Sequence, residues 1–117
     1  MPIEEQVRLS HMLEAAREIA QFVEGKKEID LETDRKLFLA LLALFQILGE
    51  AAKHVSLATR EAHPEIEWSG ATRMRDRLAH AYFHVDYQIV WDTATVKIPK
   101  LISQLEPLVT QSRLDLE

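Results

Sequence analysis

The chain of 117 residues contains no cysteine. This absence excludes a disulfide framework, a thiol nucleophile, and zinc or iron–sulfur sites with cysteine ligands. Glycine and proline are also scarce, with 3 and 4 residues respectively. Because both residues interrupt helices, their scarcity beside abundant Leu, Ala, Glu and Arg favours an all-α protein. The content of 47% hydrophobic and 28% charged residues is typical of a globular chain rather than a disordered one.

The sequence also lacks a hydrophobic run long enough for a bilayer. Its longest apolar stretch, residues 37–48, is interrupted by Gln46 and followed by Gly49 and Glu50. A buried helix fits this stretch better than a transmembrane one, which needs about 20 apolar residues. The first five residues are acidic and lack the apolar segment of a secretion signal, so we expect a cytoplasmic protein without a membrane partner. The length suits a single helical domain over residues 1–115.

Hydrophobic residues recur at helical spacing in four long segments, and no stretch alternates as strands do. The expected helices cover residues 3–24, 30–57, 68–82 and 86–109. Residues 58–63 add a possible further turn before Pro64. The pattern predicts an antiparallel bundle of four or five helices. Because residues 38–48 are apolar nearly all round, we expect the second helix to be central in the bundle or to form a dimer seam.

Several residues mark the ends of these helices. Gly25 follows the first helix as a cap glycine, Ser69 is a potential N-cap of the third, and Asp86 caps the fourth. Pro99 is expected to kink or divide the last helix, because it removes a backbone hydrogen bond. Trp68 and Trp91 are expected to anchor the third helix rather than to stack on bases.

The charge balance points to local rather than extended contact with nucleic acid. The formal net charge of −5 argues against a general nucleic-acid coat, which is usually basic. Against this acidic background, Arg73, Arg75 and Arg77 surround the single Asp76. Such a positive patch suits contact with one or two phosphates rather than with a long backbone.

The stretch from Arg75 to Tyr82 carries the strongest chemical signal. Arg75 is a permanent planar cation, His80 can exchange a proton near neutral pH, and Tyr82 supplies a phenol. Cleavage of a phosphodiester without a metal requires charge stabilisation and proton transfer, so these residues suit a ribonuclease that needs no cofactor. On an ideal helix, however, five residues advance about 140° past a full turn. Arg75 and His80 therefore converge only if the helix ends near His80, if Arg75 curls back, or if a second copy completes the site.

The order and spacing of several sequence motifs along residues 5–110 resemble those of the HEPN superfamily. Within it, the match is to the HepT-like toxins of HEPN/MNT toxin–antitoxin systems. The spacing Arg-x4-His-x-Tyr carries the resemblance together with three stretches around it. These are Gly49-Glu50-Ala51-Ala52-Lys53, His63-Pro64-Glu65-Ile66-Glu67-Trp68, and the segment from Met74 through Phe83 to Val85-Asp86 and Ile89-Val90-Trp91.

The resemblance implies metal-independent cleavage of RNA at a cleft between two subunits of a homodimer. Arg75 and His80 match the catalytic pair, and Asp76 and Arg77 match supporting positions, with Asp76 expected to orient Arg75 or His80. Tyr82 matches the tyrosine to which a nucleotidyltransferase antitoxin of the MNT type, using ATP and magnesium, adds AMP to silence the toxin. The need for two proton-transfer groups also favours a dimer. Attack by a ribose 2′-OH needs both a base and an acid, whereas one motif offers only one histidine.

Other interpretations remain open at this stage. A helical module of the same superfamily with weak or no activity could hold a nucleotide or a protein partner through the same arginines. An amphipathic helix with a solvated arginine face would also give this spacing by chance. His80 and His84 form a possible metal pair, but a third ligand is missing nearby, so no metal site is expected. Glu50 and Lys53 are expected to be a solvated ion pair unless one of them faces the cleft.

Overall fold

The computed structural model describes residues 2–79 and 86–116, except for the side chains of Ala79 and of residues 111–116. The described residues form helices and no strands, which confirms the all-α prediction. The elements are α1 (Ile3–Val23), α2 (Asp30–Thr33), α3 (Arg35–Lys53), α4 (Leu57–Ala62), α5 (Trp68–Ala79), α6 (Tyr87–Asp92), the π-helical turn η1 (Thr93–Lys97) and α7 (Ile98–Leu116).

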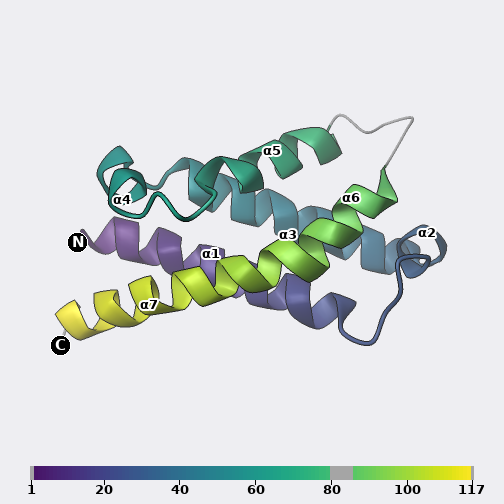
Figure 1. Ribbon diagram of the computed structural model, residues 1–117, viewed down its shortest axis with the longest axis horizontal. Coiled ribbons are helices and arrows are strands. Elements are labelled where there is room, and N and C mark those ends of the chain that lie inside the picture. Colours follow the sequence, from purple (N-terminus) through teal and green to yellow (C-terminus); the bar gives the residue numbers. More distant parts are fainter. Residues whose placement is uncertain (1, 80–85, 117) are drawn as a thin grey trace.

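Four rods make up the bundle. Helices α6, η1 and α7 follow one another without interruption and form one rod, and α1, α3 and α5 form the other three (Figure 1). Successive rods run in opposite directions, with the short helices α2 and α4 at opposite ends (Figure 1). Helix α1 packs on α3 and α7, and α3 also packs on α5. The predicted antiparallel bundle is confirmed.

Helix α3 supplies the centre of the core, as its sequence predicts. Phe45, Leu41 and Leu48 are almost completely buried and face the buried side chains of α1. Not all apolar side chains of α3 are buried inside the bundle, however. Leu39 and Ile47 of α3 stay 45% and 51% exposed, so one face of this helix remains uncovered in a single chain.

The expected continuous helix over residues 30–57 is wrong, because two polar side chains end it and restart it. Asp34 has an extended backbone (φ −110°, ψ 93°), and its Oδ1 accepts a hydrogen bond from the Leu37 backbone N–H at 3.2 Å. Ser56 caps α4 in the same manner by accepting from the Thr59 N–H at 3.2 Å. Asp and Ser favour such caps over helix interiors because their short side chains compete for backbone groups. The additional turn expected at residues 58–63 is confirmed as α4.

Glu5 ties α1 to the start of α4. Its carboxylate accepts hydrogen bonds from the Ser56 backbone N–H at 2.8 Å and from the Thr59 hydroxyl at 3.2 Å. Burial raises the pKa of Glu5, but the hydrogen bonds from Ser56 and Thr59 outweigh burial and leave this pKa below its ordinary value. A buried ionised carboxylate with these donors fixes the end of the bundle at which α4 lies.

Helix α5 begins at the expected residue, but the expected N-cap is wrong. It starts at Trp68, so Ser69 lies inside the helix and is not its N-cap. The Ser69 hydroxyl instead accepts a hydrogen bond of 3.4 Å from Arg73, one turn later. Trp68 is buried, and its indole N–H donates to the His63 carbonyl at 3.0 Å, which confirms its expected anchoring role.

The final rod also begins as expected but ends later. Asp86 caps α6, because its Oδ1 accepts from the Ile89 backbone N–H at 3.2 Å. Pro99 does not divide the rod, since α7 begins at Ile98, directly after the π-helical turn η1, and continues through Pro99 to Leu116. Wide π turns are a common way for a helix to accommodate a missing backbone donor. Across the described ranges, no helix has the length and apolar character required to cross a membrane.

Candidate functional site

The site is built where α5 approaches α3 most closely. A Cβ atom at Gly49 of α3 would lie 3.0 Å from the Arg75 Cβ and 3.1 Å from the Ala71 carbonyl oxygen of α5. Both distances are shorter than normal van der Waals contact, so the close approach requires glycine at this position. The Arg75 side chain therefore leaves the backbone at the tightest contact between the two helices.

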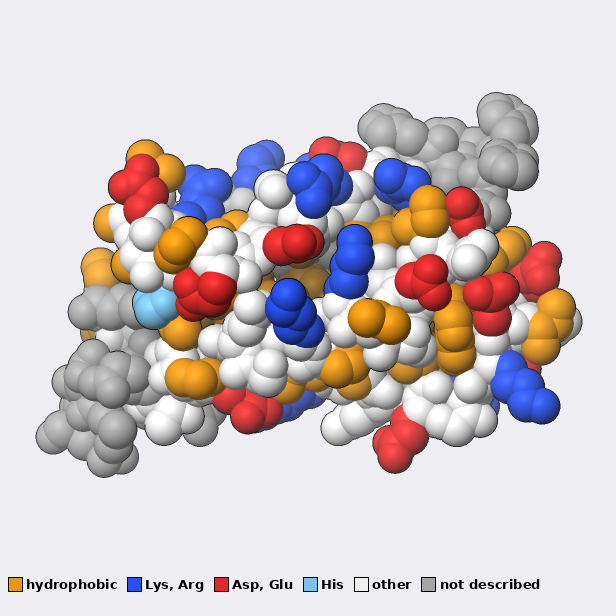
Figure 2. Space-filling view, in the orientation of Figure 1, with side chains coloured by type: hydrophobic (Ala, Val, Ile, Leu, Met, Phe, Trp, Pro, Cys, Tyr) orange, Lys and Arg blue, Asp and Glu red, His pale blue; other side chains and the backbone are white. Residues whose placement is uncertain are grey.

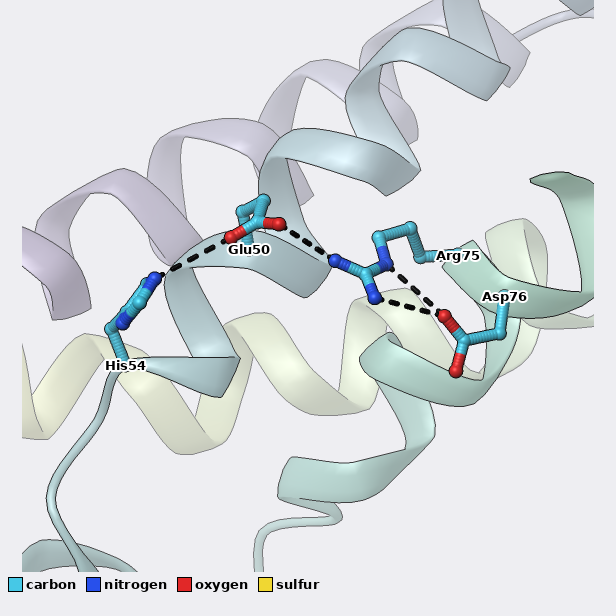
Figure 3. A network of polar contacts seen from close by, with 4 residues as sticks. All are labelled: Glu50, His54, Arg75 and Asp76. Atoms are coloured by element: carbon cyan, nitrogen blue, oxygen red, sulfur yellow. Dashed lines mark hydrogen bonds and ion pairs between the residues drawn. The ribbon is translucent and has the colours of Figure 1, made fainter.

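Two carboxylates hold the Arg75 guanidinium (Figure 3). Its Nη1 donates to Glu50 Oε1 of α3 at 2.7 Å, and its Nε and Nη2 donate to Asp76 Oδ1 at 3.2 and 2.9 Å. The hydrogen bond to Asp76 and the charges of Asp76 and Glu50 raise the pKa of Arg75 above its ordinary value. The other oxygen of Glu50, Oε2, lies 3.5 Å from His54 Nε2, so the polar network continues along α3.

This arrangement orients the Arg75 guanidinium but does not engage all of its hydrogen-bond donors. A guanidinium has five N–H donors, and within the described part of the chain the three hydrogen bonds to Glu50 and Asp76 leave two, one on each terminal nitrogen. The side chain is 23% exposed, so part of it is accessible to a ligand. A planar cation fixed in this way suits a phosphate oxygen, because the orientation needs no further ordering when the ligand binds.

The other arginines of α5 lie on a different flank of the helix. Arg73 and Arg77 line a cavity of about 330 Å³ between α5 and the η1–α7 rod, together with Lys97 and Lys100. The single positive patch expected from the sequence is therefore divided. Arg75 faces α3 and is held by the carboxylates of Glu50 and Asp76. Arg73 and Arg77 face the last rod.

A second, open groove runs beside Glu50 between α1 and α3. Its lining includes Arg8 and His11 of α1 and Ile47, Glu50 and His54 of α3, and its volume is about 520 Å³. His11 and His54 are exposed, as expected for surface or interface residues. The network around Arg75 is therefore continuous with an open surface on its α3 side.

The structure brings only some of the predicted site residues together. Asp76 contacts Arg75, as the expected orienting role requires, whereas Arg77 lines the cavity on the other flank. His80 and Tyr82 lie outside the described residues, as does His84, so their convergence with Arg75 stays a prediction. Within the described ranges, no group of three or more His, Asp or Glu side chains could hold a metal ion.

Sequence reasoning favoured a solvated ion pair for Glu50 and therefore missed its contact with Arg75. The alternative, that Glu50 faces the cleft, stays a prediction, and the structure shows that Glu50 pairs with Arg75 of the motif. The sequence did contain a signal for this contact, at Gly49, the residue before Glu50. A glycine inside an otherwise apolar helix often marks a close backbone approach, and Gly49 marks the approach of α5.

An antiparallel helical bundle whose Arg-x4-His motif begins at an arginine fixed against a neighbouring helix has the features of the HEPN class of helical proteins. The family described as ribonuclease HepT-like matches residues 12–108. The chain therefore belongs to the HepT-like ribonuclease family, and the resemblance inferred from its motifs is confirmed.

Individual relatives agree with this assignment over most of their length. The chain is 37% identical to a probable ribonuclease HepT of Thermococcus cleftensis over 86% of its own length and 91% of the relative. It is 32% identical to a candidate RNase of Caldanaerobacter subterraneus subsp. tengcongensis, over 90% of this chain and 94% of the relative. A candidate RNase of Methanocaldococcus jannaschii is 30% identical, over 86% and 84% respectively. No solved structure matches the chain significantly.

Proposed function

We propose that this single helical domain, residues 1–115, is the toxin of a toxin–antitoxin pair and acts as a metal-independent endoribonuclease. The observation that carries the proposal is the Arg75 guanidinium, held by Glu50 and Asp76 with two donors remaining for a phosphate. Membership of the HepT-like ribonuclease family supports the same activity. Arg75 would bind the phosphate that is attacked, Asp76 would orient Arg75, and His80 would transfer protons.

The reaction needs both a base and an acid. The base removes the proton of a ribose 2′-OH, whose oxygen attacks the adjacent phosphorus atom. The bond from phosphorus to the 5′-oxygen breaks, and the acid protonates that oxygen, which leaves a 2′,3′-cyclic phosphate and a free 5′-OH. Arg75 stabilises the additional negative charge on the phosphorane. Two His80 side chains, one from each subunit of a homodimer, would fill the roles of base and acid.

The uncovered face of α3 is a suitable surface for this dimer. Leu39, Ala43 and Ile47 are exposed and follow one another at four-residue spacing, so they form one stripe. The stripe continues to Glu50, the partner of Arg75. Two copies packed along it would place both Arg75 networks at one interface. Light scattering should give a dimer at micromolar concentration, and a monomer would contradict this assembly.

The catalytic proposal is tested with purified, unmodified protein in EDTA. RNA should be cleaved, with 2′,3′-cyclic phosphate ends, because no step uses a metal. His80→Ala should reduce the rate by about 10²–10⁴-fold, the usual loss when a general acid or base is removed. Circular dichroism and thermal unfolding should show an intact fold. Full activity of His80→Ala would contradict the site, and an inactive wild-type protein that binds a nucleotide or partner would identify a non-catalytic module.

Regulation is proposed to act through Tyr82 and a nucleotidyltransferase antitoxin that uses ATP and magnesium. An adenylyl group at Tyr82 would add bulk and negative charge close in sequence to Arg75 and Arg77, and one of these arginines would then hold the added phosphate in place of RNA. Incubation with the cognate enzyme should add about 329 Da or multiples of it, the mass of AMP units, at this residue.

Two comparisons decide this regulatory proposal. RNA cleavage should fall as the modified fraction rises, and Tyr82→Phe should keep its fold and its helical content but escape modification. Modification at another residue, or none with an active antitoxin, would contradict the proposal and leave steric blocking by the partner.

A further inference from the structure

The cavity on the other flank of α5 has an apolar floor and a basic rim. Its floor is formed by side chains from the four helices α3, α5, α6 and α7, among them Phe45, Leu48, Met74, Ile89, Ile98 and Leu101. Four cations, Arg73, Arg77, Lys97 and Lys100, surround it. Figure 2 shows the hollow with hydrophobic side chains at its base and Lys and Arg side chains beside it.

These four cations have no direct ion-pair partner in the described part of the chain. None of them forms an ion pair with a described residue, in contrast to Arg75 with its two carboxylates. Among the described residues, Arg73 has one hydrogen-bond partner, the hydroxyl of Ser69 at 3.4 Å. Four like charges around one cavity repel one another, and a bound anion would relieve this repulsion.

Two acidic residues, Glu65 and Glu67, also line the cavity, but at one end of it. Gln104 of α7 marks this end, because its side-chain amide donates to the Glu65 carbonyl at 3.0 Å. Lys97 precedes Gln104 by seven residues, about 10 Å along a helix. Helices α5 and α7 run in opposite directions (Figure 1), so Arg77 faces the same end as Lys97. The cavity therefore has a basic end at Arg77 and Lys97.

The size of the cavity limits the ligand. A volume of about 330 Å³ is at the lower end of the range for small-ligand sites and suits one nucleotide but not a duplex. An apolar floor accommodates the face of a base, while cations at one end hold its phosphates. The combination of floor and rim fits one unit of single-stranded nucleic acid.

We infer that this cavity binds a nucleotide of the RNA strand on one side of the cleaved bond, with its base on the apolar floor and its phosphate at Arg77 and Lys97. This inference rests on the proposed ribonuclease function and assigns a subsite to it. Arg77 lies two residues after Arg75 on α5, so one helix would connect the subsite to the arginine of the catalytic motif. A strand held at both flanks of α5 would be fixed in register relative to Arg75.

Methyl NMR of the whole protein with a 2′-O-methyl RNA octamer tests the inference. The 2′-O-methyl group prevents attack by the 2′-oxygen, so binding is measured without cleavage. Titration should shift the methyl signals of Ile89, Val96 and Leu101 in the cavity. Shifts of the Ile47 methyl on α3 report separately on the Arg75 side.

Charge reversal gives the matched comparison. Lys97→Glu with Lys100→Glu should weaken octamer binding at least about tenfold and lower the slope of log affinity against log salt by about 0.7, as expected for the loss of one phosphate contact. Lys26→Glu with Lys27→Glu produces the same change in net charge at two exposed residues outside the cavity. This control should change affinity and slope far less.

The outcomes separate the subsite from the enzyme. The protein could bind the octamer and cleave RNA while the methyl signals of the cavity do not shift. This result would overturn the subsite and leave the ribonuclease proposal intact. Equal losses in the two double variants would also overturn it, because binding would then depend on net charge alone. Cavity shifts caused by free AMP but not by the octamer would assign the site to a free nucleotide and contradict the inference. Absence of RNA cleavage by the wild-type protein is a failure of the proposed function instead.

Discussion

The two flanks of α5 carry the same residue type in opposite environments. Arg75 faces α3 at a glycine contact, and two carboxylates fix its guanidinium. Arg73 and Arg77 face the η1–α7 rod over an apolar floor, and neither forms an ion pair with a described residue. The first flank orients one cation for chemistry, and the second keeps several cations available for binding.

Helical geometry explains this division. Two residues advance about 200° around an α-helix, so alternate positions point in nearly opposite directions. Arg73, Arg75 and Arg77 alternate in this way, and a run that reads as one positive patch in the sequence becomes two surfaces. The number of arginines in a motif therefore says less than the position of each relative to the neighbouring helices.

The largest expected difference between the flanks is kinetic. Arg75→Ala should lower kcat by about 10²–10³-fold, because it removes donors that stabilise the charged phosphorane. Arg77→Ala should raise KM roughly tenfold while kcat stays within about twofold, because it removes binding that is equal in the ground and transition states. Steady-state cleavage of a short fluorogenic RNA measures both constants. Equal losses of kcat in the two variants would show that the flanks have no separate roles.

A smaller effect is expected from closing the space between α3 and α5. Gly49→Ala places a methyl group 3.1 Å from a backbone carbonyl, so α5 must shift. The variant should lose about 1–3 kcal/mol in free energy of unfolding, the usual cost of overpacking, although alanine favours helices more than glycine does. Urea unfolding measures this loss. Gly70→Ala on α5 is the control, since its added Cβ meets only ordinary contacts of 3.5 Å or more, and a stabilised Gly49→Ala would contradict the described contact.

The smallest expected difference concerns the charges themselves. Glu50→Gln removes a half-exposed ion pair and should change the free energy of unfolding by at most about 1 kcal/mol. Lys100→Ala, on the unpaired flank, should change it by less than about 0.5 kcal/mol, because no ion pair is lost there. Thermal unfolding of both variants compares them. A larger loss for Lys100→Ala would show that the basic rim stabilises the fold rather than binding a ligand.

Much of the architecture could be predicted because periodicity and caps are local properties. The apolar repeats gave the long helices, and Asp86 gave the start of the last rod. The break at Asp34 was missed because the apolar pattern runs across it, and only the capping hydrogen bond shows which state Asp34 adopts.

The candidate site was less accessible to sequence reasoning. The motif identified Arg75 and Asp76, whose contact is between neighbours in the chain. The contact of Arg75 with Glu50 joins residues 25 positions apart, and the basic cavity joins α5 to the last rod. Such pairs depend on how helices pack against one another, which a single sequence does not encode in its local pattern.

The π-helical turn at residues 93–97 gives the last rod a property that its residues alone do not. A π turn holds more residues than an α turn, so α6 and α7 are out of phase with a single continuous α-helix. If all five of these residues adopted α-helical geometry instead, α7 would rotate by about 100° relative to α6. Lys100 and Leu101 would then turn away from α5 while Ile89 kept its place. The π geometry of this segment therefore sets which side chains meet across the cavity.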